Sequence, residues 1–212
     1  MLRIRITYKK FGDLIYTGHL DLQKIWERSF RRANLPLAYS SGFHPQARIQ
    51  QAAPLPLGFL GNNEIVDIWI NCEKMISNIE QNLIGSLPNG IQIIKSEIVD
   101  LKSPSLQSKV IAAQYRISFI DFINENEIQT KVKKIIRSKK IPCEKKGKTY
   151  NLRELIEDLK IQSMALPHQL VLLMRLKHLP GATGRPEEVL KVLEVDFSAV
   201  QIERENLYFE PI

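Results

Sequence analysis

Cysteine is scarce in this chain of 212 residues, in which only Cys72 and Cys143 are present. Two cysteines cannot supply the four thiolates of a structural zinc site or of an iron–sulfur cluster. They also cannot form the dense disulfide framework of a small secreted domain. We therefore expect both to be reduced, ordinary side chains of a cytoplasmic protein.

Long apolar runs are absent as well. No stretch approaches the ~20 residues that a membrane-spanning helix needs. The first six residues alternate charged and aliphatic side chains, which predicts a strand and not a signal peptide. With 44% hydrophobic and 25% charged residues, the chain has enough apolar material for a packed core. The sequence predicts neither a membrane protein nor a disordered one.

Common catalytic and nucleotide-binding fingerprints are also lacking. The sequence contains no P-loop, no Gly-x-Gly-x-x-Gly and no Gly-x-Ser-x-Gly elbow. Its four histidines show no His-x-x-x-His spacing and no clustering with cysteine. We expect no cofactor and no metal, although a metal site assembled from distant residues stays open. The loop at 181–185, ahead of a predicted helix, would hold an anion through its backbone N–H groups or would only turn the chain.

Positive charge is what the sequence has in excess, with a net charge of +7 at pH 7. Residues 1–50 contain nine Lys and Arg against three acidic residues, and residues 131–148 contain nine against Glu144 alone. Two separated basic regions suit a polyanion such as nucleic acid. Charge that merely solubilises two helices would give the same pattern.

Hydrophobic periodicity predicts a mixture of strands and helices in the first hundred residues. We expect strands at 3–9, 14–16, 48–55, 64–72 and 91–99, and helices at about 17–33 and 74–87. This order matches a ferredoxin-like split βαβ unit. Residues 101–110, which contain proline and serine, have the composition of a linker.

A similar pattern follows the predicted linker. We expect strands at 113–119, 170–177 and 199–209, helices at 124–138 and 185–193, an extended pair at 141–152, and a short helix or turn at 152–159. The sequence therefore predicts an α+β fold of two tandem ferredoxin-like (βαββαβ) units with antiparallel sheets. Their expected bounds are residues 1–100 and 111–212.

The first predicted helix and the loop after it carry the candidate functional residues. Thr17 or Asp21 is expected to cap the helix, and the unpaired N–H groups there, next to His19, favour an anion. A half-exposed turn position for His19 is the simpler alternative. We expect Leu20, Ile25, Trp26, Phe30 and Ala33 on the apolar face of the helix and cations on the other. The candidate RNA- or anion-binding residues are His19, Arg28, Arg31, Arg32, Tyr39, Ser41, His44 and Arg48.

His44 and, more weakly, His19 are candidates for general acid–base catalysis of RNA cleavage without a metal. Tyr39, Ser41 and Arg48 lie close to His44 in the sequence. A His-Pro pair in a loop that contains glycine is also ordinary turn chemistry. We therefore assign no catalytic residue with certainty from the sequence.

Several motifs resemble the radical SAM-linked family, a bacterial domain of unknown function (domain of unknown function 2344). They are Tyr8-Lys9-Lys10-Phe11-Gly12, Gly18-His19-Leu20-Asp21-Leu22, Arg28-Ser29-Phe30-Arg31-Arg32-Ala33, Tyr39-Ser40-Ser41-Gly42-Phe43-His44-Pro45, Leu55-Pro56-Leu57-Gly58 and Glu64-Ile65-Val66-Asp67. The resemblance is dense over about the first 70 residues and looser afterwards. Gly18 stands where the family commonly has serine, which weakens any role for a hydroxyl at that position.

The resemblance implies a B12-binding-type radical SAM protein as partner, fused to this domain or encoded beside it. It also implies genes for a ribonuclease and for ribosomal proteins nearby, and it implies no established activity. This chain lacks the three-cysteine cluster of a radical SAM core, so it would be the accessory part.

Three functions remain open from the sequence. The first is a non-catalytic RNA-binding module that presents RNA to the radical SAM enzyme. The second is a protein–protein docking domain for that enzyme. The third is a metal-independent endoribonuclease of the tandem ferredoxin-like type. A pseudouridine synthase is less favoured, because a Gly-Arg-Thr-Asp type of catalytic motif is missing.

Overall fold

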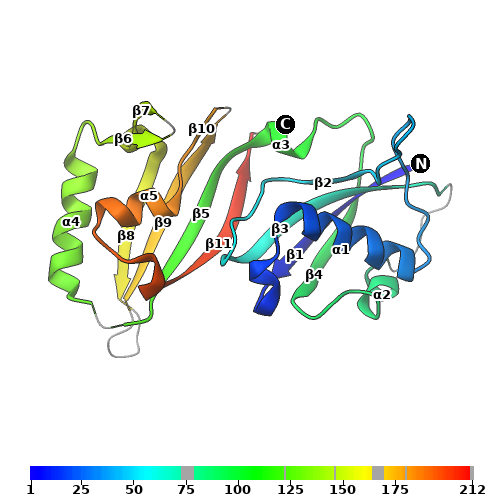
Figure 1. The fold of residues 1–212 in the computed structure, drawn as a ribbon, viewed down its shortest axis with the longest axis horizontal. Coiled ribbons are helices and arrows are strands. Elements are labelled where there is room, and N and C mark those ends of the chain that lie inside the picture. Colours follow the sequence, from blue (N-terminus) through cyan, green and yellow to red (C-terminus); the bar gives the residue numbers. More distant parts are fainter. Residues whose placement is uncertain (73–78, 122, 146, 164–169, 180, 211–212) are drawn as a thin grey trace. The chain divides into compact units, whose positions relative to one another are not determined.

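The structure is a computed structural model that describes residues 1–72, 79–121, 123–145, 147–163, 170–179 and 181–210. The chain divides into two compact units, Met1–Val110 and Ile111–Ile212, and strands and helices are mixed in both (Figure 1). No helix among the described residues has the length and apolar character that crossing a bilayer requires. Residues 74–78 of the predicted helix at 74–87 lie outside the described residues.

Among its described residues the first unit has four strands, which pair antiparallel in the order β4-β1-β3-β2. Its elements are β1 (Leu2–Lys10), η1 (Gly12–Tyr16), α1 (His19–Arg32), β2 (Ile49–Gln51), β3 (Leu60–Ile70), α2 (Ile79–Ile84), β4 (Ile91–Val99) and α3 (Leu106–Lys109). Figure 1 shows α1 and α2 against the same face of this sheet.

The core of the first unit lies between this face and α1. Ile4 and Ile6 of β1 pack with the buried residues Leu22, Trp26 and Phe30 of the helix. Because successive side chains of a strand point to opposite faces, Arg3 and Arg5 of β1 lie on the face away from α1. They stand opposite Trp69 and Asp67 of β3 in the antiparallel register.

Three local expectations for the start of this unit are wrong. Residues 14–16 belong to a 3₁₀ helix, closed by a bond from Thr17 N–H to Leu14 O, and form no strand. Gly18 is the N-cap of α1 and no side chain caps it. Leu20 is 70% exposed, because it lies two residues, about 200° around the helix, from Leu22, which takes the buried position.

The stretch predicted to be a linker, residues 101–110, is structured and belongs to the first unit. It contains α3, in which Leu106 is buried. The Arg3 guanidinium donates to the carbonyls of Ser103 and Pro104, the latter at 2.9 Å. A long-range bond to a buried cation thus fixes a segment whose composition is typical of linkers.

The second unit has strands paired around β9. Its elements are β5 (Val110–Phe119), α4 (Glu125–Arg137), β6 (Pro142–Lys145), β7 (Lys148–Asn151), η2 (Leu152–Leu155), β8 (Ile156–Ser163), β9 (Leu170–Leu179), β10 (Ala182–Thr183), α5 (Pro186–Val192), η3 (Phe197–Ala199) and β11 (Val200–Phe209). β9 pairs antiparallel with β5, β8 and β10, and β5 also neighbours β11. Without the short β10 and the hairpin β6–β7, the sheet order β8-β9-β5-β11 repeats the order β2-β3-β1-β4 of the first unit.

In this unit the structure differs most from the sequence-based expectation at β8. The sequence predicts a short helix or turn at 152–159, but only Leu152–Leu155 is helical and Ile156–Ser163 is a strand. It pairs with β9 from Ile156 opposite Leu176 to Ser163 opposite Leu170, with a bulge near its start. The bulge breaks the strict alternation that identifies a strand in the sequence, so tertiary pairing decides this element.

Candidate nucleic-acid interface

The three arginines of the candidate site on α1 have different surroundings. All three are exposed, and they differ in their hydrogen bonds. Arg32 turns along the protein surface, where its Nε donates to the carbonyl of Ser86 at 3.2 Å and its Nη2 to Ser29 Oγ at 3.2 Å. The guanidinium of Arg32 is thus committed to an internal carbonyl, whereas Arg28 and Arg31 face solvent.

Arg31 is held in a surface triad with Glu27 and Tyr39. Its Nε donates to Tyr39 Oη at 3.3 Å, its Nη2 lies 3.4 Å from Glu27 Oε1, and the Tyr39 hydroxyl donates to the same carboxylate at 3.4 Å. The hydrogen bond to Tyr39, followed by the charge of Glu27, raises the pKa of Arg31. Arg31 therefore stays positively charged, but the negative charge of Glu27 offsets part of its positive charge.

The loop between α1 and β2 is a narrow hairpin. Tyr39 bridges to Ala47, and Ser40 N–H donates to Gln46 O at 2.8 Å. Residues 41–45 form its exposed tip, which carries Ser41, His44 and a fully exposed Phe43. These side chains are open to a partner.

His19 and His44 do not share a site. His19 begins α1, where its carbonyl accepts a bond from Gln51 Nε2 at 3.2 Å and its buried Nδ1 has no partner in the described part of the chain. Tyr39, at the base of the loop, contacts Glu27 and Arg31, which lie eight and twelve residues further along the helix. At 1.5 Å per residue these positions are about 12–18 Å from His19. The described residues contain no group of three or more metal ligands.

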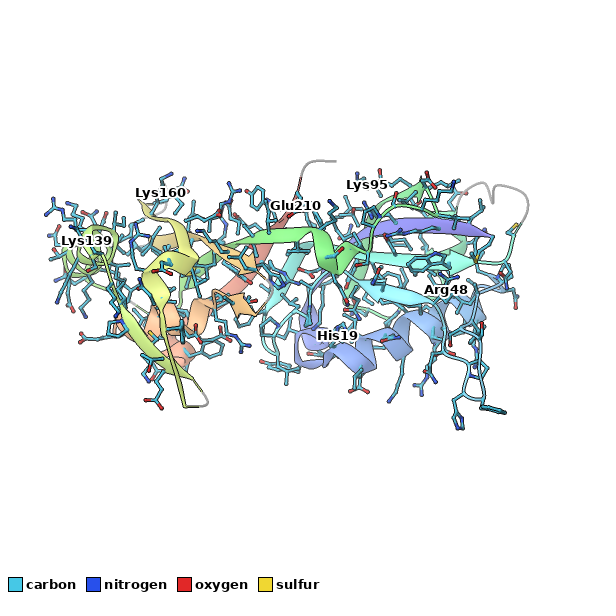
Figure 2. All side chains as sticks on the ribbon, turned by 90° about the horizontal axis from the view of Figure 1, so that it is seen from above. His19, Arg48, Lys95, Lys139, Lys160 and Glu210 are labelled. Carbon is cyan, nitrogen blue, oxygen red and sulfur yellow. The ribbon has the colours of Figure 1, made fainter. Side chains whose placement is uncertain are left out.

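Arg48 lies on the other face of the sheet. Ala47 and Ile49 belong to the core beneath α1, so the alternating position of Arg48 faces away from the helix. Its guanidinium carbon lies 5.0 Å from the ring centroid of Trp69. In Figure 2, His19 lies on the helix side of this sheet and Lys95 lies on the opposite side. The structure therefore separates Arg48 from Arg28 and Arg31.

Trp69 is a functional candidate that the sequence reasoning missed. Arg3, from β1 on the other side of β3, lies 4.9 Å from the same ring. The sequence does contain a pattern that could have identified Trp69. Asp67 and Trp69 alternate with the apolar Ile68 and Ile70, so the first two lie on the face of the strand away from the core. Trp69, Arg3 and Arg48 line a cavity of about 440 Å³ with polar residues of the loop and of the segment before α3.

A second basic surface lies on α4. Asn124 caps this helix and acidic side chains occupy its first turn, whereas its C-terminal half and the following residues are cationic, as the helix dipole favours. None of the exposed cations there forms an ion pair with a carboxylate among the described residues; they are Lys133, Lys134, Arg137, Lys139 and Lys140. Lys131, by contrast, pairs with Glu127 at 2.9 Å and Glu194 at 2.8 Å. Figure 2 shows Lys139 at this helix.

The loop at 181–185 lines a different cavity, of about 650 Å³, in the second unit. Glu154 and Glu188 line it with Arg185 and Tyr150. Burial and then the hydrogen bond with Glu188 raise the pKa of Tyr150. Because two carboxylates face one arginine, this lining gives no support to anion binding by the loop.

The protein thus has mixed strands and helices, and among its described residues the exposed cations of α4 without ion pairs are its distinctive surface feature. The chain belongs to the family of uncharacterized proteins conserved in bacteria called DUF2344, whose model matches residues 3–186. No curated protein matches it.

Two solved structures are similar in fold. One is an H/ACA RNP bound to a substrate RNA containing 2′-deoxyuridine, with 8% identity, a TM-score of 0.50, and coverage of 98% of this chain and 49% of that one. The other is a Cbf5-Nop10-Gar1 complex, with 8% identity, a TM-score of 0.50, and coverage of 98% and 50%. This chain thus spans about half the length of the chains it matches, and the likeness concerns the fold alone.

Proposed function

We propose that this protein is a non-catalytic RNA-binding accessory module of the cytoplasm, made of two ferredoxin-like domains at 1–100 and 111–212. Its partner is a B12-binding-type radical SAM enzyme, fused or separate, that acts in RNA modification or ribosome-related RNA metabolism. The repeated strand order of the two units supports the tandem architecture. The resemblance of the N-terminal motifs to the radical SAM-linked family supports the partner.

The observation that carries RNA binding is the row of unpaired cations on α4. Five exposed cations lie within eight positions, from Lys133 to Lys140, and none is in ion-pair contact with a carboxylate of the described residues, although Glu194 acts on Lys134 at longer range. A cation that meets a phosphate releases condensed counterions, which gives favourable and salt-dependent binding. A cation already paired with a carboxylate gains less, since it must first give up that partner.

The candidate residues on α1 and its loop form the second part of the proposed grip. Arg28 and Arg31 are exposed, Tyr39 bonds to Arg31, and Ser41 and His44 at the exposed loop tip offer further hydrogen bonds. Arg32, His19 and Arg48 contribute from separate positions. The RNA-bound state of one structure with a similar fold is compatible with this proposal.

A charge-matched comparison tests the proposal. The variant Lys133→Glu/Arg137→Glu/Lys140→Glu and the control Lys95→Glu/Lys160→Glu/Lys191→Glu change the net charge equally at exposed positions. Binding of labelled structured RNA is measured between 50 and 200 mM salt. We expect the α4 variant to lose about 10- to 1,000-fold in affinity near 100 mM salt, and its log–log salt slope to fall by about 2–3.

Equal losses in both variants, or none in either, would remove the basis for an RNA site on α4. Docking on the radical SAM enzyme alone is the rival function. It predicts that the α4 variant still co-purifies with the enzyme while the wild-type protein binds no RNA. An endoribonuclease predicts cleavage of labelled RNA in EDTA that His44→Ala abolishes.

A further inference from the structure

The surroundings of Trp69 combine a flat aromatic group with unneutralised positive charge. Arg3 approaches the indole from the β1 side and Arg48 from the β2 side, at 4.9 and 5.0 Å from the ring centroid. The backbone fixes the second contact, because Trp69 N–H donates to Arg48 O at 3.0 Å. Contacts of guanidinium groups with an aromatic ring at this distance are cation–π contacts.

The charges around this ring do not cancel. Asp67 is shared by Arg3 and Arg5, at 2.6 Å and 2.9 Å. Arg48 has no carboxylate partner among the described residues; its Nη1 donates to Met1 Sδ at 3.5 Å. Of the two arginines that line the cavity, Arg3 is offset by Asp67, and no described residue of the lining is acidic, so Arg48 leaves one net positive charge there.

The rim of the cavity offers neutral hydrogen-bonding groups. Ser40, Gln46, Gln50 and Ser103 line it. The Gln50 side-chain amide forms no hydrogen bond with any residue that the structure describes. Amides and hydroxyls of this kind read the edges of bases. The volume of about 440 Å³ falls within the range of about 300–1,000 Å³ of ligand pockets.

We propose that this cavity binds one unpaired nucleotide of an RNA strand. The base stacks on the plane of Arg48, which the Trp69 ring supports from behind, the N–H edge of the same guanidinium meets the phosphate, and the rim contacts the base edge. A duplex cannot offer an unstacked base, so this site selects single-stranded segments. The inference rests on the proposed RNA binding and adds to it the form of the RNA.

The burial of the two arginines decides which of them can be substituted to test the cavity. Arg3 is 2% exposed and bonded to Asp67, so its removal would disturb the fold. Arg48 is exposed and forms no ion pair with any residue that the structure describes, which makes Arg48→Gln the primary variant. Lys95→Gln, an exposed lysine on the same sheet face, is its charge-matched control. Trp69→Leu is the second variant, used after its circular dichroism spectrum matches the wild type.

Binding is measured for a 12-nucleotide oligouridylate, a blunt RNA duplex of equal length, and uridine monophosphate. We expect Arg48→Gln and Trp69→Leu to weaken oligouridylate binding by about 5- to 150-fold, the range for loss of one stacked base. Duplex affinity should change by less than about 2-fold, and Lys95→Gln should change neither. In a Trp26→Phe background Trp69 is the sole tryptophan, and oligouridylate should quench its fluorescence.

Each contrary result has one meaning. Equal loss of oligouridylate and duplex affinity in Arg48→Gln, or no loss in either, overturns the nucleotide pocket. Monophosphate binding as tight as that of the oligonucleotide would assign the cavity to free nucleotides and overturn its role in RNA. If duplex binding through α4 persists in these cases, the proposed RNA-binding function stands. If the wild-type protein binds no RNA at all, the proposed function itself is contradicted.

Discussion

Arg3 Nη2 lies 2.6 Å from Asp67 Oδ2, and the two side chains are 2% and 0% exposed. The carboxylate also receives Arg5 Nε at 2.9 Å, and the same Arg3 guanidinium donates to the segment before α3. Two cations of β1 therefore share one buried carboxylate, and one of them, Arg3, also holds residues 103 and 104.

Removal of the Asp67 charge should destabilise the protein strongly. Asp67→Asn leaves Arg3 buried without a counter-charge, which costs about 3–5 kcal/mol of unfolding free energy. Urea denaturation followed by circular dichroism measures the loss. Glu97→Gln, which breaks the exposed pair with Lys95, is the control and should cost about 0–1 kcal/mol. A loss below about 1 kcal/mol in Asp67→Asn would contradict the buried pair.

Gly90 should tolerate alanine worse than Gly147 does. Both have positive φ, +101° and +73°, but a Cβ on Gly90 would lie 2.6 Å from the Phe11 carbonyl oxygen, whereas one on Gly147 meets no described atom within 4 Å. The backbone conformation alone costs about 1–2 kcal/mol for alanine, and overpacking adds about 1–3 kcal/mol. Thermal unfolding of Gly90→Ala and Gly147→Ala tests the order; equal losses would contradict the close approach.

His178 should make stability depend on pH below neutrality. Burial, and then the charge of Arg204, lower the pKa of this imidazole in the folded protein. The unfolded chain, with a pKa of about 6.5, then takes up the proton first. Stability should fall as the pH drops from about 6.5 through the folded pKa, and this group should cause no further loss below it.

The variant His178→Gln isolates this contribution. Melting temperatures of the wild type and of His178→Gln are compared at pH 7.5 and 5.5. We expect a smaller drop in melting temperature on acidification for the variant, since glutamine does not titrate. The same drop in both proteins would show that other groups cause the pH dependence.

Neutralising Glu27 should strengthen RNA binding if α1 contacts RNA. Glu27→Gln removes the carboxylate that pairs with Arg31 at 3.4 Å and leaves the full positive charge facing solvent. We expect an increase in affinity of about 2- to 5-fold at low salt, which shrinks as salt screens the charges. Glu97→Gln, an equal charge change on a different surface, should give a smaller increase. No difference between the two would place α1 outside the RNA interface.

Elements with a regular hydrophobic period were predictable from the sequence. The strand expected at 91–99 is β4, Ile91–Val99, and the helix expected at 124–138 is α4, Glu125–Arg137. The buried residues Ile128, Val132 and Ile135 of α4 recur at the helical period, which local spacing determines. The sequence did not predict β8, because the bulge between Ile156 and Asp158 interrupts the alternation typical of a strand.

The candidate site was predictable in composition and only partly in geometry. The sequence determined that cations concentrate at α1, its loop and α4, since charge and helical period are local properties. Only the tertiary structure decided which of them are available: Arg32 bonds to Ser86, 54 residues away, and strand alternation moves Arg48 to Trp69, on the face opposite Arg28. Pairings between distant residues depend on how strands align across the sheet, and no local pattern records that alignment.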